Sequence, residues 1–309
     1  MTTLRLRIGT RASNLARWQA NWVATQLTAG GVQVELVPIT TRGDAVERGR
    51  IEELGGPGVF TKELQRAVLD GQVDLAVHSL KDLPTEQVEG LILAAVAERE
   101  DVRDVLISRG GEPLDQLPQQ AVIGTGSLRR RAQLLCVRSD LEMRDIRGNV
   151  DTRLQKLAAG PYDAIVLAYA GLKRLGLDDQ ITQVLQPDML LPAVGQGALA
   201  IEARVDDRAT RAALARLDHA STHRSVLAER TLLAALCGGC MAPVGAWARE
   251  LAAGQLRLDA VVLSPDGRQR IAAWSSTSDG DAPRLGSEVA NQLLAQGAAE
   301  LIERSRQAP

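Results

Sequence analysis

The stretch PAVGQGALAIE, residues 192–202, decides how the chain is divided. Gly195 and Gly197 flank a single glutamine, and a pair of glycines suits a backbone that crosses from one domain to another. The apolar run that follows, residues 198–201, predicts a strand. We therefore expect the chain to return here to a first domain after it has formed a second one.

Ahead of this stretch, strand and helix patterns alternate in two groups, which is typical of α/β lobes. The first group has predicted strands at 4–9, 32–39, 73–77 and 91–97 and helices at 60–69 and at 14–28, the latter with Ser13 as N-cap. The second group has strands at 105–107, 121–123, 143–146 and 164–167, with helices opening after the turns at 124–131 and 147–153. Two such lobes joined by two crossovers resemble periplasmic-type binding proteins, which close on a ligand by hinge motion.

Beyond residue 220 the pattern changes to that of a small α+β domain, an antiparallel sheet with helices on one face. We predict helices at 220–236, 285–296 and 299–304 and strands at 244–247, 256–263 and 271–275, with a hairpin signal SPDG at 264–267. The predicted fold is thus α/β, with two binding-protein-like lobes, a double crossover hinge and this C-terminal domain. The expected boundaries are 1–98 with 198–216 for lobe 1, 102–192 for lobe 2 and 220–309 for the third domain.

Composition excludes several classes of protein. The chain has 309 residues, 45% of them hydrophobic, but no window approaches the roughly 18 apolar residues of a membrane span, and its N-terminus lacks a signal-peptide core. An odd count of three cysteines fits a reducing compartment. The net charge of -2 argues against nucleic-acid binding. We therefore predict a cytoplasmic protein that binds neither membrane nor nucleic acid, and we separately expect a monomer.

Arginine supplies nearly all of the positive charge, since only four of the 36 basic residues are lysines. Codon bias alone could explain that abundance, so the positions of the arginines, rather than their number, are the evidence for a ligand site. Five arginines fall in or beside strand-to-helix turns, where free helix N–H groups add to their charge and favour anions: Arg11, Arg129, Arg130, Arg147 and Arg153. Any one of them could lie on a solvated face, but five in equivalent turns favour a site for several carboxylates or phosphates. Bidentate recognition explains the choice of arginine over lysine.

Two further stretches predict features of a ligand site. The polar residues of HSLKDLP, 78–84, follow a buried strand, and open α/β sheets bind ligands at such strand ends. The long polar loop 40–58, which contains GGPG, predicts a mobile lid.

The stretch LCGGCMAP, 236–243, places Cys237 and Cys240 at CxxC spacing. A redox or metal site would use both sulfurs, whereas a covalent anchor needs only one. Zinc needs two more ligands, yet there is no second CxxC, and His78, His219 and His223 lack ligand spacing. A thioredoxin-like site places its CxxC at a helix N-terminus, whereas this one follows a helix. We predict no metal site.

Seven motifs together resemble one family in order and spacing over nearly the whole chain. They are GTRAS at 9–13, HSLKDLP at 78–84, SLRR at 127–130, RGNV at 147–150, AGLKRLG at 170–176, PAVGQG at 192–197 and GGC at 238–240. The chain closely resembles the hydroxymethylbilane synthases, also called porphobilinogen deaminases.

The resemblance implies an enzyme that condenses four porphobilinogen molecules head to tail, releases four ammonia molecules and hydrolyses the product off as hydroxymethylbilane. In this family the product grows on a dipyrromethane cofactor held by a thioether to one cysteine, and the matching position is Cys240. Each pyrrole carries an acetate and a propionate, so the cofactor and the growing product gather the negative charge that the arginine turns could bind.

The resemblance also implies roles for individual residues. Asp82 matches the catalytic aspartate, whose carboxylate would stabilise the cationic azafulvene formed when ammonia leaves; the alternative is that Asp82 only caps the turn before Pro84. The implied cofactor-binding residues, besides Asp82, are Ser79, Lys81, Ser127, Arg129 and Arg130. The implied substrate-binding residues are Arg11, Ser13, Phe60, Arg147, Arg153 and Arg174. Gln196 and Arg230 match family positions with a hinge or other role.

The sequence departs from the family pattern in two places. Glu53 and Pro57 stand where lysines are expected in the loop before Phe60, and Cys237 stands where an acidic or polar residue is common. The alternative function is a non-catalytic bilobal binding protein for an anionic small molecule.

Overall fold

The computed structural model describes residues 4–40, 61–236, 242–251 and 254–307. The chain divides into two units, Met1–Glu100 with Ala198–His223 and Asp101–Gly197 with Arg224–Pro309. The chain therefore passes between the units near residues 100 and 197 and again within the helix that follows His219. The three-domain boundaries given above stay a prediction, and each unit is described on its own.

The first unit contains a five-stranded sheet with the order β2-β1-β3-β10-β4. Its strands are β1 (Arg5–Thr10), β2 (Gln33–Pro38), β3 (Leu75–Ser79), β4 (Leu91–Val96) and β10 (Leu199–Arg204). Strand β1 runs parallel to β2 and β3, whereas β10 is antiparallel to both of its neighbours, β3 and β4. The apolar run after the glycine pair therefore enters the first sheet.

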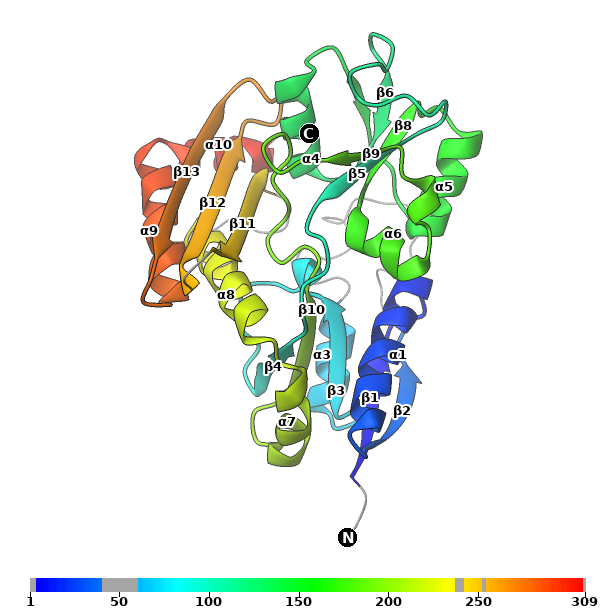
Figure 1. Cartoon of the computed structure of the whole chain (residues 1–309), viewed down its shortest axis with the longest axis vertical. Coiled ribbons are helices and arrows are strands. Elements are labelled where there is room, and N and C mark those ends of the chain that lie inside the picture. The colour runs from blue at the N-terminus through cyan, green and yellow to red at the C-terminus, as the bar shows by residue number, and fades with distance from the viewer. Residues whose placement is uncertain (1–3, 41–60, 237–241, 252–253, 308–309) are drawn as a thin grey trace. The chain divides into compact units, whose positions relative to one another are not determined.

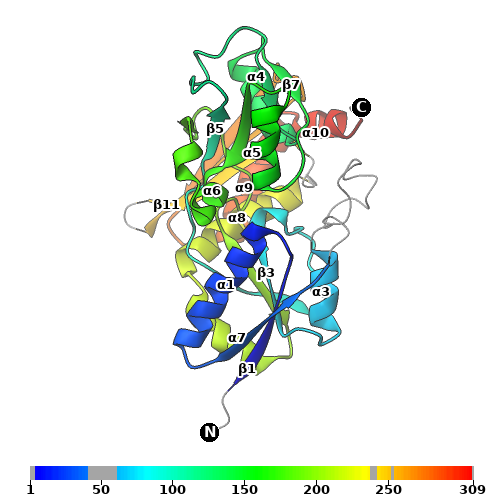
Figure 2. The same ribbon diagram turned by 90° about the vertical axis from the view of Figure 1, so that its right-hand side faces the viewer.

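Helices cover both faces of this sheet (Figure 2). Helix α1 (Asn14–Ala29) packs Ala20, Val23 and Leu27 onto one face, together with α7 (Arg208–Leu214). Helix α3 (Lys62–Leu69) packs Leu64 and Val68 onto the other. Because both faces are covered, β4 is a continuous apolar run and β3 begins as one, whereas β1 and β2 keep polar residues.

The second unit repeats this plan in a sheet with the order β7-β6-β8-β5-β9. Its strands are β5 (Asp104–Ser108), β6 (Val122–Gly124), β7 (Glu142–Arg144), β8 (Ala164–Ala168) and β9 (Gln183–Leu185). Helix α4 (Leu128–Val137) covers one face, and α5 (Val150–Ala159) and α6 (Tyr169–Leu175) cover the other. The sequence patterns did not predict β9, which has only three residues and pairs at the sheet edge with β5.

A three-stranded antiparallel sheet, β11-β12-β13, completes the second unit (Figure 1). Its strands are β11 (Val244–Glu250), β12 (Leu256–Leu263) and β13 (Arg270–Thr277). Side chains from α8 (Ala220–Ala235), α9 (Ala282–Ala295) and α10 (Ala298–Gln307) pack on one face of it in a single apolar core. The predicted fold class, two α/β lobes linked by crossovers with a small α+β domain, is confirmed. Within the described residues no helix is both long enough and apolar enough to cross a membrane.

Strand β3 ends two residues later than predicted. The sequence placed the break at His78, but His78 and Ser79 pair with Ala200 and Leu199 of β10. His78 Nε2 lies 3.0 Å from Glu202 Oε2, also on β10, and both residues are buried. Pairing with a strand more than a hundred residues away cannot be read from local periodicity.

The second crossover is held by backbone conformation and by side chains of the same unit. Gly195 and Gly197 have φ angles of 72° and 88°, which favour glycine. The N–H of Gly195 donates to the buried carboxylate of Glu229 on α8 at 2.7 Å, and the same carboxylate accepts from Ala248 of β11 at 2.8 Å. Glu229 thus ties the crossover to the C-terminal sheet.

Replacing Gly267 by alanine is expected to destabilise the second unit markedly. Gly267 lies in the β12–β13 hairpin with φ +74°, and an added Cβ would lie 2.5 Å from the carbonyl oxygen of Ala132 and 2.7 Å from the nitrogen of Cys136, both on α4. Left-handed strain and backbone overlap together should lower the free energy of unfolding by about 3 kcal/mol. Chemical denaturation checks this.

Gly280→Ala is the matched control, because Gly280 has the same φ of +74° but no atom within 4 Å of the added Cβ. It should cost only about 1 kcal/mol, the strain of the left-handed backbone. Equal losses in the two variants would contradict the packing argument.

Candidate active site

In the first unit, the expected site residues lie at one edge of the sheet. Strands β1 and β3 are parallel neighbours, so the turns after their carboxyl ends lie side by side. The turn after β1 carries Arg11 and leads to Ser13, whose Oγ caps α1 by accepting from Ala16 N at 3.3 Å. The turn after β3 carries Lys81 and Asp82.

Asp82 closes a short 3-10 turn, Leu80–Asp82, directly after buried β3. Backbone atoms hold this turn, since Leu83 N donates to Leu80 O at 3.0 Å. The side chain of Asp82 is half-buried. Ser79, at the end of β3, accepts a hydrogen bond from Gln19 of α1 at 2.8 Å, which links α1 to the end of β3.

In the second unit, four more of the predicted arginines follow two parallel neighbours, β6 and β7. Ser127 caps α4 by accepting from Arg130 N at 3.4 Å, so Arg129 and Arg130 lie in its first turn. Arg147 precedes α5, and Arg153 on α5 donates through Nε to Gly148 O at 2.8 Å. The structure thus brings these arginines to the carboxyl edge of one sheet.

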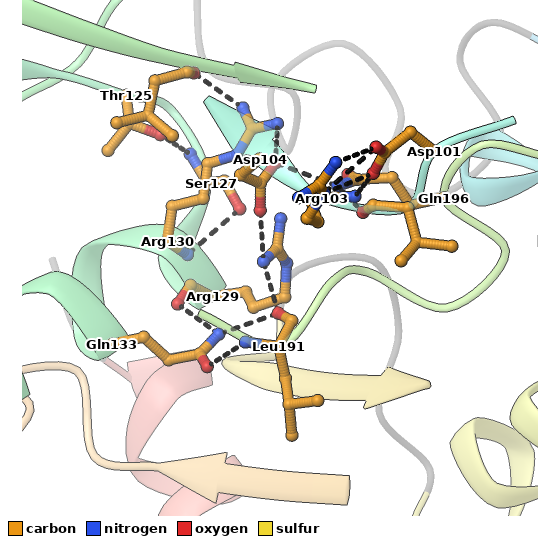
Figure 3. Close-up of polar contacts among 12 residues, drawn as sticks. Asp101, Arg103, Asp104, Thr125, Ser127, Arg129, Arg130, Gln133, Leu191 and Gln196 are labelled. Atoms are coloured by element: carbon orange, nitrogen blue, oxygen red, sulfur yellow. Dashed lines mark hydrogen bonds and ion pairs between the residues drawn. The ribbon is translucent and has the colours of Figure 1, made fainter. Parts of the chain in front are cut away.

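Sequence reasoning missed Asp104, a fully buried carboxylate between Arg129 and Arg130 (Figure 3). Its Oδ2 lies 2.8 Å from Arg129 Nη1, and its Oδ1 accepts from Arg130 Nε at 3.0 Å and Nη2 at 2.7 Å. The one local signal was an acidic residue opening an otherwise buried strand. Which cations it meets depends on α4, which follows later in the chain.

Electrostatics at this cluster favours an anion. Burial alone raises the pKa of Asp104, but the charges of Arg129 and Arg130 outweigh it and bring that pKa to about 2. Burial lowers the pKa of Arg129, and the charge of Asp104 opposes this. One ionised carboxylate against two guanidinium groups leaves an excess positive charge among buried side chains.

A buried hydrogen-bond donor of Arg129 without a partner also favours an anion at this cluster. Arg129 is 4% exposed, and its Nε is buried with no hydrogen-bond partner among the described residues. Buried N–H groups without a partner are costly, so this one favours an acceptor from outside the chain, such as an ordered water or an anionic ligand. The donor set fits a group that carries several carboxylates.

Three other predicted residues occupy different surroundings. Gln196 is fully buried and donates to Val102 O at 2.8 Å and to Asp104 Oδ1 at 3.0 Å. Arg174, on α6, donates to Gly197 O at 2.6 Å. Arg230 is half-buried on α8.

Several predictions lie outside the described residues. These are Phe60, Cys237, Cys240, the two departures at Glu53 and Pro57, and all of the expected lid except Thr40. The cysteine that the structure does describe, Cys136, is exposed and unpaired. Among the described side chains, no group of three or more His, Cys, Asp or Glu residues could hold a metal ion.

The fold and the arginine-bearing turns are those of a multidomain α/β protein whose strand ends favour anionic groups. A family model described as porphobilinogen deaminase, dipyromethane cofactor binding domain, matches residues 6–212, and one described as porphobilinogen deaminase, C-terminal domain, matches residues 223–295. The chain belongs to the porphobilinogen deaminase family, as its motifs indicated.

Curated relatives cover nearly the whole chain. Porphobilinogen deaminase of Trichlorobacter lovleyi is 50% identical over 305 residues, 98% of this chain and 97% of that protein. Porphobilinogen deaminase of Pelotomaculum thermopropionicum is 47% identical over 304 residues, with the same coverage of 98% and 97%. Similar solved structures include the methionine-binding protein MetQ, with a TM-score of 0.45 at 12% identity over 72% of this chain and 90% of that one, so the family assignment rests on the sequence relatives.

Proposed function

We propose that this chain acts as a hydroxymethylbilane synthase, a transferase that joins four porphobilinogen molecules head to tail with release of four ammonia molecules and then hydrolyses the product free. The observation that carries the proposal is the match to porphobilinogen deaminases over 98% of the chain, with both family domains in place. A cytoplasmic, monomeric state stays a prediction from the sequence.

Substrate binding is assigned to the arginine turns. Porphobilinogen carries an acetate and a propionate, and a guanidinium group can bind each carboxylate with two parallel hydrogen bonds. Arg11, Arg147 and Arg153 lie at or near helix N-termini, where backbone N–H groups add to the attraction for anions. We assign Ser13, Phe60 and Arg174 to the same task.

The cofactor is assigned to the residues that carry the strongest positive charge and to one thiol. Arg129, Arg130 and Ser127 are assigned to carboxylates of the dipyrromethane, and so are Ser79 and Lys81. Cys240 would form the thioether. The unsatisfied Nε of Arg129 supports this assignment. When bound, the dipyrromethane supplies the pyrrole carbon to which the first substrate is joined.

Asp82 is assigned to catalysis. Loss of ammonia from porphobilinogen leaves a positive charge on the ring, and a nearby carboxylate stabilises that charge. At a separation of 4 Å and an effective dielectric constant of 20, the attraction is about 4 kcal/mol. A carboxylate that is in place before the charge develops needs no reorganisation, which is the usual source of electrostatic catalysis.

Incubation of the purified protein with porphobilinogen tests the function. We expect a linear tetrapyrrole, four ammonia molecules per product, and an intact protein mass that exceeds the sequence mass by the cofactor and rises in substrate-sized steps. A non-catalytic binding protein would keep its unmodified mass and form no product, and that result would overturn the proposal.

A further inference from the structure

We infer that Asp104 is a positioning residue, which holds the guanidinium groups of Arg129 and Arg130 in place for the cofactor. The inference rests on the proposed function and deepens it, because Asp104 would act only through the two arginines. It concerns residues of the second unit alone (Figure 3).

Both oxygens of the Asp104 carboxylate face side chains of the same unit. Oδ1 takes Arg130 Nε, Arg130 Nη2 and Gln196 Nε2, at 3.0, 2.7 and 3.0 Å, and Oδ2 takes Arg129 Nη1 at 2.8 Å. Asp104 has no exposed surface, and its oxygens face Arg129, Arg130 and Gln196. Any role in the reaction has to run through its partners.

The two arginines are held in different ways. Arg130 uses three nitrogens in the protein: Nε and Nη2 on Asp104, and Nη1 on Val166 O at 2.9 Å. Arg129 makes both of its contacts through Nη1, to Asp104 and to Leu191 O at 2.6 Å. The Nε–H of Arg129 is buried and donates to no group among the described residues. Asp104 contacts Arg129 at Nη1 only. The edge of the guanidinium that contains Nε, which can bind a carboxylate side-on, is therefore left for a ligand.

The carboxylate of Asp104 also sets the net charge of the buried cluster. Without Asp104 the cluster would hold two buried positive charges, and with it the excess is one. Burial of an unpaired charge is expensive, so this arrangement folds without a ligand and still favours an anionic group when one arrives.

Asp104 is also tied to both chain segments that cross between the units. It opens β5 just after the first crossover, and Gln196 of the second crossover donates both to it and to Val102 O. Gln133 of α4 bonds both the N–H and the carbonyl of Leu191, at 2.8 and 3.1 Å. The position of the arginine pair is thereby set relative to both crossovers.

Asp104→Asn is the test, with Asp74→Asn as the matched control. Asp74 accepts two hydrogen bonds from the guanidinium of Arg7, at 2.8 and 3.1 Å, in the first unit and away from the proposed site. We expect Asp104→Asn to be purified largely without the cofactor mass, and turnover in its loaded fraction to fall on the order of 100-fold, as for a misplaced binding group. Asp74→Asn should carry the cofactor as the wild type does, even where its melting temperature falls equally.

Arg129→Lys keeps the inference testable if Asp104→Asn does not fold. Lysine preserves a cation opposite Asp104 but removes the Nε donor, so we expect a melting temperature near that of the wild type and loss of most of the cofactor mass. Wild-type cofactor loading in Asp104→Asn or Arg129→Lys, or equal loss in Asp74→Asn, would overturn the inference. Product formation by the wild type, measured in parallel, tests the proposed function separately.

Discussion

Replacing Cys240 by serine is expected to abolish cofactor attachment and, with it, turnover. A thioether requires sulfur, because the thiolate is a strong nucleophile near neutral pH whereas a serine hydroxyl is weak without an adjacent base. The intact mass of the purified variant should equal its sequence mass, and no tetrapyrrole should form from porphobilinogen.

Two other cysteines serve as controls. Cys237→Ser and Cys136→Ser, the latter at an exposed position, should keep the cofactor mass and near-normal turnover. Equal loss in Cys237→Ser and Cys240→Ser would instead point to a site that uses both thiols of the CxxC. The experiment therefore decides between the two interpretations that the spacing alone permits.

Replacing Asp82 by asparagine is expected to leave the cofactor attached, or nearly so, while kcat falls by about 100- to 1000-fold, the usual loss when one preorganised electrostatic group is removed. The amide has nearly the same shape but no charge, so it cannot offset the positive charge that forms as ammonia leaves. Mass spectrometry and steady-state rates on the same preparation separate the two effects.

Glu86→Gln makes the same change of charge four residues further along, at an exposed side chain, and should leave kcat unchanged. Turnover at the wild-type level in Asp82→Asn would remove Asp82 from the mechanism. An unmodified mass in that variant would assign Asp82 to cofactor assembly rather than to the condensation steps.

Much of the fold was predictable because its signals are local. Strand β12 has the predicted bounds, Leu256–Leu263, since its apolar residues and the SPDG turn lie within a few positions of one another. Ser13 caps α1 as predicted, because an N-cap needs only its own side chain and the first helical turn. The arginine turns were also visible, since each follows a strand pattern and precedes a helix pattern.

The sequence by itself determined the family, the order of the elements, and which residue types stand at the ends of the strands. Only the tertiary structure decided where β3 ends and what Arg129 and Arg130 contact. Strand β3 continues through Ser79 because β10, which follows the second lobe in the sequence, supplies its hydrogen-bond partners within the first sheet. Asp104 meets the two arginines because β5 and α4 pack together, and a buried ion pair between distant segments leaves no periodic pattern along the chain.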